Sequence, residues 1–264
     1  MRTPIVNELE ALIQERGQEI NRWFSAQFSE APAPFYSSVD LRHSLFKVVP
    51  VDTNLFPAGF NNLSPAARNR AAVSFKRFLV REYPEAKKIL ILPENHTRNL
   101  AYLENLYVLR NLLTEAGAEV QIGRLEGDET LTLTSVANNE IVEYAIEKKD
   151  GKLQTRDGFV PDIIVVNNDL TNGVPELMVD IIQLLIPSPD VGWHRRRKSR
   201  HFAAYSKVIK AFAQEFDLDC WKMWTAFEQR ENLDFKTRQG MDEVAEAAHK
   251  VLSDVAAKYK EYGV

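Results

Sequence analysis

Apolar side chains recur every three or four residues along several stretches of the chain, which is the spacing of helices with one buried face. The first such stretch begins at Thr3 and Pro4, a pair typical of a helix start, and ends before residues 31–34. It carries Ile5, Leu9, Leu12, Ile13, Ile20, Trp23 and Phe24. The same spacing predicts helices over residues 64–82, 98–116, 175–186, 198–216 and 242–259.

Short continuous apolar runs between these helices indicate strands that are buried on both faces, as in parallel sheets. Residues 89–92 and 162–166 are such runs, and residues 119–123 form the strand expected between them. These alternating strands and helices predict an α/β fold with a parallel-sheet core and flanking helices.

Two further segments are expected to be extended. Residues 130–148 alternate polar and apolar positions, which predicts an antiparallel hairpin insert with a turn at residues 148–151. Residues 39–51 also look extended, with Phe46, Val48 and Val49 as candidates for the inward face. The last part of the chain is expected to be helical, so the whole fold is α/β with a helical C-terminal part.

Composition narrows the class of protein. The 264 residues can bury a substantial core, and 45% hydrophobic and 27% charged residues are ordinary values for a globular protein. The net charge of −4 argues against a general nucleic-acid binder. No secretory signal and no apolar run of membrane-spanning length are visible, so a cytoplasmic location is the default expectation. A single cysteine, Cys220, excludes an intrachain disulfide.

The stretch from Val51 to Leu63 is the densest group of candidate chemistry. It combines Asp52, Asn54, Asn61 and Asn62 with apolar side chains, directly before a helix start at residues 64 and 65. A carboxylate can hold an ammonium group, while amide N–H groups and a helix N-terminus can hold a carboxyl group, so the stretch suits an amino acid. The alternative is an ordered turn whose polar side chains bond to their own backbone.

Both buried strands end in polar clusters. Residues 93–99 follow the first strand and residues 167–173 follow the second. Ligands of open α/β sheets bind beyond the carboxyl ends of parallel strands, so a site is predicted at this edge. For each residue alone, a helix cap or a turn is the competing interpretation.

The run from His194 to His201 is strongly basic in an acidic chain. It can be a clamp for phosphate or carboxylate at a helix start, a solvated charged face, or a patch for nucleic acid or membrane. We rank the anion clamp first and nucleic acid last.

Several generic motifs are missing. The sequence has no Walker phosphate loop, no dinucleotide fingerprint and no Gly-x-Ser-x-Gly elbow. The five histidines show no metal-ligand spacing, and Cys220 beside Trp221 reads as a core thiol. No catalytic residue and no metal ligand is therefore singled out.

Taken together, five segments resemble one known family, the small glutamate–cysteine ligases of some proteobacteria, which are distantly ATP-grasp-like. The segments are residues 38–42, 51–63, 93–99, 167–170 together with 173–176, and 192–199, and the second is the most specific. The resemblance implies that ATP phosphorylates the γ-carboxylate of glutamate and that the amine of cysteine then attacks the acyl phosphate. It implies ATP and Mg²⁺ as cofactors, glutamate and cysteine as small-molecule partners, and a pre-ATP-grasp-like fold.

The resemblance also assigns residues. It implies substrate binding by Arg42, Asp52, Asn54, Asn61, Asn62, Asn95, Arg98, Asn168 and Asp169, and anion binding by Arg195, Arg196 and Arg197. The glycine-containing ATP loop and the magnesium-binding carboxylates of the family are not found in this sequence. We therefore expect residues 1–216 to be the substrate-binding domain and residues 217–264 to begin an ATP-grasp-like portion, so that the chain is the N-terminal portion of such an enzyme.

Two alternatives are kept. The same scaffold can serve another ATP-dependent carboxylate–amine ligase, or a non-catalytic amino-acid-binding module. Neither a membrane nor a nucleic acid is expected as a partner, and the sequence leaves a homo-oligomer open.

One prediction concerns geometry. Arg42, Asp52 and Asn54 are expected to converge on one polar pocket, with Arg42 as the natural cationic partner of Asp52 and a substrate ammonium group as the competing one.

Overall fold

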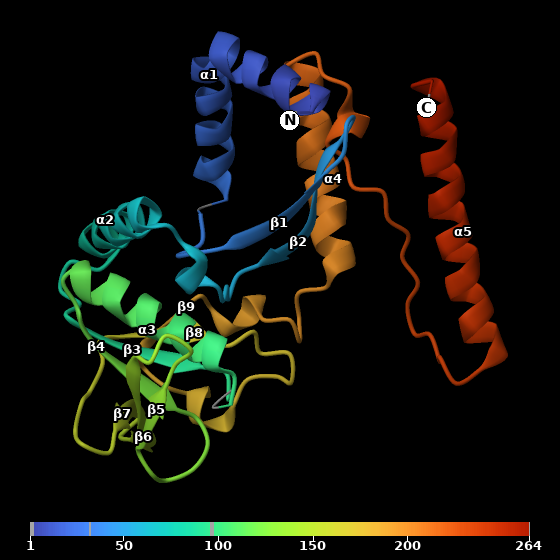
Figure 1. Ribbon diagram of the computed structural model, residues 1–264. Coiled ribbons are helices and arrows are strands. Elements are labelled where there is room, and N and C mark those ends of the chain that lie inside the picture. Colours follow the sequence, from blue (N-terminus) through green and yellow to red (C-terminus); the bar gives the residue numbers. More distant parts are fainter. Residues whose placement is uncertain (1–2, 32, 96–97, 264) are drawn as a thin grey trace. The chain divides into compact units, whose positions relative to one another are not determined.

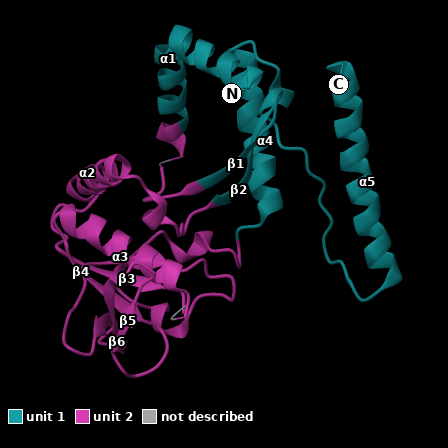
Figure 2. Ribbon diagram, in the orientation of Figure 1, with its two compact units in different colours: residues 1–27, 39–53, 196–264 teal, residues 28–38, 54–195 magenta. Residues whose placement is uncertain are grey.

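The computed structural model describes residues 3–31, 33–95 and 98–263 of the chain (Figure 1). These residues form two compact units, each built from segments that are distant in sequence (Figure 2). The first unit contains residues 1–27, 39–53 and 196–264, and the second contains residues 28–38 and 54–195. Because His96 and Thr97 lie outside the described residues, the predicted cluster after the first buried strand is described only in part.

A mixed sheet is the centre of the second unit. Among the described residues its strand order is β5-β6-β4-β3-β8-β9, with β7 paired to β6. The strands are β3 (Lys88–Pro93), β4 (Glu119–Arg124), β5 (Leu131–Thr134), β6 (Glu140–Lys149), β7 (Lys152–Thr155), β8 (Ile163–Asn167) and β9 (Leu184–Ile186). The strands β6, β4, β3, β8 and β9, in this order across the sheet, are parallel to their neighbours. Strands β5 and β7 each pair with β6 in antiparallel fashion. The predicted parallel core and hairpin insert are confirmed.

Each face of this sheet is covered by its own hydrophobic core, because successive side chains of a strand point to opposite faces. In β3, Ile89 and Ile91 pack with α2 (Pro65–Glu82) and α3 (Leu100–Glu115), while Leu90 and Leu92 pack into the core of the other face. Figure 1 shows both helices on one side of the sheet. All four of these side chains have at most 1% of their surface exposed, which accounts for the continuous apolar run in the sequence.

The first unit is mainly helical. It holds most of α1 (Pro4–Glu30), which is kinked at Arg16, together with α4 (Lys198–Glu215) and α5 (Arg238–Glu261). Strands β1 (Ser38–His43) and β2 (Val48–Asn54) form a two-stranded sheet, as the extended pattern predicted. Ile20, Ile209, Phe212, Phe216 and Met223 make the core of this unit.

Short 3₁₀ helices connect the main elements. They are η1 (Phe60–Asn62), η2 (Glu176–Met178), η3 (Pro189–Val191) and η4 (Cys220–Lys222). None of the helices in the described part of the chain combines the length and the apolar character that crossing a bilayer would need.

The predicted helix over residues 175–186 is wrong. Only η2 is helical there, Asp180 has a left-handed backbone with φ of 52°, and β9 follows as a strand parallel to β8. The Gln183 side chain explains the change, since its Nε2 donates to the carbonyl oxygens of Leu153 (2.8 Å) and Pro161 (2.9 Å). These bonds to distant residues hold the segment extended.

The compact units differ from the two domains expected with a boundary after Phe216. Phe216 and Met223 lie in one hydrophobic core, so the structure is continuous across that point. Assignment of residues 217–264 to an ATP-grasp-like portion stays a prediction.

Candidate functional site

In the second unit, the polar loops after β3 and β8 meet at one edge of the sheet. The two strands are parallel neighbours, and Pro93 lies opposite Asn167 at their ends. Asn168 Nδ2 donates to the Pro93 carbonyl oxygen at 3.4 Å, which joins the two loops directly. The predicted meeting of both polar clusters at the carboxyl edge is confirmed for the described residues.

The loop from Asn54 to Leu63 is fixed to the same edge by buried carboxamides. Asn167 Nδ2 donates to the Pro57 carbonyl oxygen at 2.8 Å. Asn105 Oδ1, from the middle of α3, accepts from the backbone N–H groups of Gly59 (2.8 Å) and Phe60 (3.0 Å). Asn105 and Asn167 are 1% and 2% exposed, so these bonds form away from water, where an unpaired polar group is costly.

Two tyrosines complete this buried network. Tyr102 donates from its hydroxyl to the Asn167 carbonyl oxygen at 2.8 Å and accepts from the Glu94 N–H at 2.9 Å. Tyr36 donates to the Val166 carbonyl oxygen at 2.5 Å. Burial raises the pKa of both hydroxyls far above the ordinary tyrosine value. Both therefore stay protonated and act as donors that fix the strand end.

Several predicted site residues bond to their own loops. Asn54 Oδ1 accepts from the Phe56 N–H (2.8 Å), Asn168 Oδ1 from the Leu170 N–H (2.9 Å) and Asp169 Oδ1 from the Thr171 N–H (2.9 Å). Each is a turn in which the side chain satisfies the backbone two residues ahead, the alternative interpretation weighed from the sequence. These three oxygens shape the edge of the sheet.

Other predicted residues of the second unit are more accessible. Asn61 Nδ2 donates to Asn62 Oδ1 at 3.5 Å in η1, and Asn62 is exposed. Asn95, also exposed, donates to Glu126, which follows β4. Arg98 is exposed just before α3. The exposed side chains of Asn62, Asn95 and Arg98 are therefore the most accessible to a ligand among these residues.

The frame of the site is built by residues that were not predicted from the sequence: Tyr36, Tyr102, Asn105 and Asn167. One sequence feature points to Asn105, since it and Glu104 are polar residues placed between Leu103 and Leu106 on the buried face of α3. Polar groups on such a face require partners, and Asn105 finds them in the loop that begins at Asn54.

In the first unit, Asp52 pairs with a different cation from the one expected. Lys198 Nζ lies 3.1 Å from Asp52 Oδ1, although the contact lacks hydrogen-bond geometry and that oxygen is buried with no hydrogen-bond partner in the described residues. Arg42 lies on β1 with an exposed side chain. The predicted Arg42–Asp52 pair is wrong because Lys198, 146 residues later in the sequence, comes closer.

Arg196 joins β2 to the start of α4. Its guanidinium donates to the Thr53 carbonyl oxygen (3.1 Å) and to Thr53 Oγ1 (2.6 Å), and it lies 3.3 Å from His201 Nδ1. Because a guanidinium can only donate, Nδ1 of His201 is the acceptor and Nε2 carries the proton, facing Thr53 Oγ1 at 3.1 Å. Burial lowers the pKa of Arg196 and of His201, and the charge of Arg196 lowers that of His201 further.

The three arginines predicted as one clamp have three different surroundings. Arg195 forms an ion pair with Asp190 in the second unit, and Arg196 holds Thr53 in the first unit. Arg197 is the N-cap residue of α4 and lines a cavity of the first unit. Only Arg197 of the three is placed as an anion clamp at a helix start would require.

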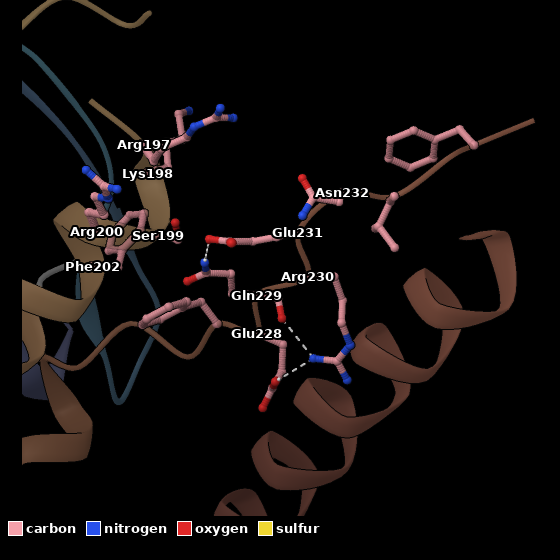
Figure 3. Close-up of a pocket in the computed structure, with 13 residues that line it drawn as sticks. Arg197, Lys198, Ser199, Arg200, Phe202, Glu228, Gln229, Arg230, Glu231 and Asn232 are labelled. Atoms are coloured by element: carbon pink, nitrogen blue, oxygen red, sulfur yellow. Dashed lines mark hydrogen bonds and ion pairs between the residues drawn. The ribbon is translucent and has the colours of Figure 1, made fainter. Parts of the chain in front are cut away.

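This cavity has a volume of about 680 Å³ and lies between the first turn of α4 and the segment before α5 (Figure 3). One wall contains Arg197, Lys198, Ser199, Arg200 and Phe202, and the other is formed by residues 227–233 and Phe235. In Figure 3 the Glu231 side chain extends from the second wall toward the start of α4. The cavity suits a small anionic ligand.

A metal site is not evident in the part of the chain that the structure describes. Among the described residues, no group of three or more His, Cys, Asp or Glu side chains is placed to hold a metal ion. The donor set therefore does not fit a magnesium site of carboxylate ligands.

Comparison with known proteins gives a consistent result. The family model described as Glutamate-cysteine ligase matches residues 10–264. A crystal structure of a provisionally named gamma-glutamylcysteine synthetase from Methylobacillus flagellatus KT is similar, with a TM-score of 0.92 and 39% sequence identity. The match covers 99% of this chain and 62% of that one, so this chain spans less than two thirds of its length. No curated protein matches the chain.

Proposed function

Because the chain belongs to the glutamate–cysteine ligase family, we propose that the protein containing it joins the γ-carboxylate of L-glutamate to the amine of L-cysteine at the expense of ATP, the first step of glutathione synthesis. The observation that carries this proposal is the family match over residues 10–264, which includes every candidate segment of the sequence. The cytoplasm, where ATP is available, is the location we propose for this reaction.

The chemistry has two balanced steps. A γ-carboxylate oxygen of glutamate attacks the terminal phosphorus of ATP, and ADP leaves with the bonding electrons. The cysteine nitrogen then attacks the acyl phosphate, an amide bond forms, and phosphate and one proton are released. Both steps build negative charge on phosphate oxygens, so cationic side chains near the reacting group accelerate them.

The residues of the second unit suit the amino-acid substrates. The frame made by Asn105 and Asn167 holds the loop after β2 without using the exposed side chains of Asn62, Asn95 and Arg98. An arginine can bind a substrate carboxylate with two parallel hydrogen bonds, and carboxamides can donate or accept. We assign substrate contacts to these side chains first, and to the turn-forming Asn54, Asn168 and Asp169 through their remaining polar atoms.

Asp52 and Arg42 of the first unit are kept as candidates for the substrate ammonium and carboxylate groups. The ion pair with Lys198 shows that an ammonium group fits beside Asp52 Oδ1, so a substrate ammonium group would have to displace Lys198 or share the carboxylate with it. No step is assigned through magnesium, since the described residues do not gather its ligands.

A coupled assay of ADP release tests the proposal. The complete gene product should release ADP only when glutamate, cysteine and ATP are all present, and the product should contain a γ-glutamyl amide. Replacing cysteine by other amino acids at equal concentration separates this ligase from one with another amine substrate. Glutamate binding without any ADP release would reject the ligase and favour a binding module.

A further inference from the structure

Strand β1 has an open edge. Among the residues that the structure describes, it pairs with β2 alone, in a two-stranded sheet (Figure 1). Strand β2 is also tied to later segments of the first unit, since the Pro50 carbonyl oxygen accepts from Thr225 Oγ1 at 2.8 Å and Arg196 bonds to Thr53. Residues 39–43 are all exposed, and no described segment other than β2 forms a hydrogen bond with them. One edge of β1 therefore presents backbone N–H and C=O groups to water.

The same strand exposes apolar side chains. Val39 and Leu41 have 50% and 56% of their surface exposed, and because they are two residues apart they share one face of the strand. Edge strands are commonly protected from pairing by a proline or a lysine, and β1 contains neither. Its two charged side chains, Asp40 and Arg42, have opposite signs and lie on the other face. An exposed edge of this kind suits pairing with a further strand.

The order of charges along β1 is self-complementary. When two copies of the strand pair in antiparallel fashion about Leu41, Asp40 of each copy lies directly opposite Arg42 of the other. Moving the centre of the pairing by one residue in either direction places two Asp40 or two Arg42 side chains opposite each other, which is unfavourable. One register is thus favoured over its neighbours, and the strand that supplies it is a second β1.

We propose that two copies of this chain associate through β1, forming a four-stranded sheet across a two-fold axis at Leu41. Such an axis uses the same surface of both copies, as a self-complementary strand requires. A strand of six residues is small beside the about 20–30 residues that each partner of a standard interface contributes. The dimer is therefore expected to be weak, with a dissociation constant on the order of micromolar. It does not rest on the proposed function.

Analytical ultracentrifugation of the 264-residue chain over a range of concentrations tests the dimer. The weight-average mass should rise with concentration from that of the monomer toward that of the dimer. Asp40→Arg and Arg42→Asp should each weaken association by about tenfold or more, because each variant places like charges opposite each other at two positions. An equimolar mixture of the two variants should associate as the parent chain does, since every opposite-charge pair is restored. The variant that carries both substitutions should do the same.

Cysteine cross-linking tests the register. Leu41→Cys should form a disulfide between two copies on mild oxidation, because opposite residues of an antiparallel pair are within the range of disulfide geometry. Val39→Cys should not, since Val39 lies opposite His43 and the two Val39 positions are offset by about 13 Å along the strands. The parent chain, with Cys220 as its single cysteine, is the background control.

Asp254→Arg is the matched control for charge, because Asp254 is exposed on α5 and should leave association unchanged. A parent chain that stays monomeric at every concentration would overturn the proposal, as would a dimer that both single charge variants retain. Equal cross-linking by Leu41→Cys and Val39→Cys would reject the register. A complete gene product that is monomeric where the 264-residue chain dimerises would show that another segment covers β1, and would overturn the dimer as well. Because ligase activity is not measured, none of these outcomes bears on the proposed function.

Discussion

Arg196 and Thr53, which are 143 residues apart in sequence, are joined by two hydrogen bonds from one guanidinium group. One bond reaches the Thr53 carbonyl oxygen at 3.1 Å, and the other reaches the Thr53 hydroxyl oxygen at 2.6 Å. The contact of Arg196 with β2 fixes the backbone beside Arg197, which lines the cavity at the start of α4. Within the basic run, Arg196 stabilises the fold, whereas its neighbour Arg197 is a candidate for ligand binding.

Replacing Arg196 by lysine should lower the free energy of unfolding by about 1–3 kcal/mol, because an ammonium group cannot reproduce the forked donor geometry. Denaturant titration followed by circular dichroism would measure the change. Arg195→Lys is the neighbouring control: its exposed ion pair with Asp190 should make a difference of at most about 1 kcal/mol. Equal losses in the two variants would show that Arg196 has no special structural role.

The fold was largely predictable because the strongest patterns are also the most buried elements. The apolar runs of β3 and β8 have both faces covered, and the helix starts at Ser64 and Asn99 carry their own caps. The helix predicted over residues 175–186 was wrong because Gln183 bonds to Leu153 and Pro161. The local spacing of apolar residues does not reveal such contacts with distant residues. Short apolar segments of this kind fit the residue spacing of a helix and that of a strand.

The candidate site was less predictable. Polar residues in loops were correctly brought to one sheet edge, yet the residues that hold the edge together come from the interior of α3 and from Tyr36. The partner of Asp52 also could not be found by sequence distance, since Lys198 belongs to a segment that returns after the whole second unit.

Asn105→Ala should destabilise the protein by about 1–3 kcal/mol, since it leaves the N–H groups of Gly59 and Phe60 without their acceptor. The loop from Asn54 to Leu63 should also exchange its amide hydrogens faster, which hydrogen-exchange mass spectrometry can localise. Asn69→Ala on the exposed face of α2 removes the same group without a buried partner and should change stability by less than about 0.5 kcal/mol. Unchanged exchange in the loop would argue against Asn105 as its anchor.

Stability should fall as the pH is lowered through the ordinary histidine range, and His201 should account for part of the fall. Its pKa in the folded protein is lowered by burial and by Arg196, so the unfolded chain binds the proton more readily. The loss begins near the unfolded pKa of about 6.5 and continues down to the folded pKa. Thermal unfolding at about pH 7.5 and about pH 5.5, on either side of that value, measures it.

The control for this pH effect is the difference between variants, because a change of pH acts on the whole protein and not on His201 alone. His201→Gln should show a smaller decrease in stability between the two pH values than the parent protein. His249→Gln, at an exposed position of α5, should behave as the parent does. A parent-like pH dependence in His201→Gln would show that the histidine makes no contribution.

Asp52→Asn separates a role in substrate binding from a role in the fold. The carboxylate pairs with Lys198, but 39% of the Asp52 side chain and 57% of the Lys198 side chain are exposed, so the pair should contribute at most about 1 kcal/mol. If Asp52 holds a substrate ammonium group, Asp52→Asn should weaken glutamate or cysteine binding about tenfold or more, as expected for a lost charge-assisted hydrogen bond, with nearly unchanged thermal stability.

Lys198→Gln is the comparison that isolates the carboxylate, because it breaks the same ion pair and leaves Asp52 in place. The two variants should lose similar stability, while only Asp52→Asn should lose amino-acid affinity in a calorimetric titration. A stability loss of about 1–3 kcal/mol in Asp52→Asn, with unchanged affinity, would instead assign Asp52 to the fold. That result would fit its proximity to Arg196 and His201, since the charge of Asp52 acts on the pKa of both and so supports the contact between β2 and α4.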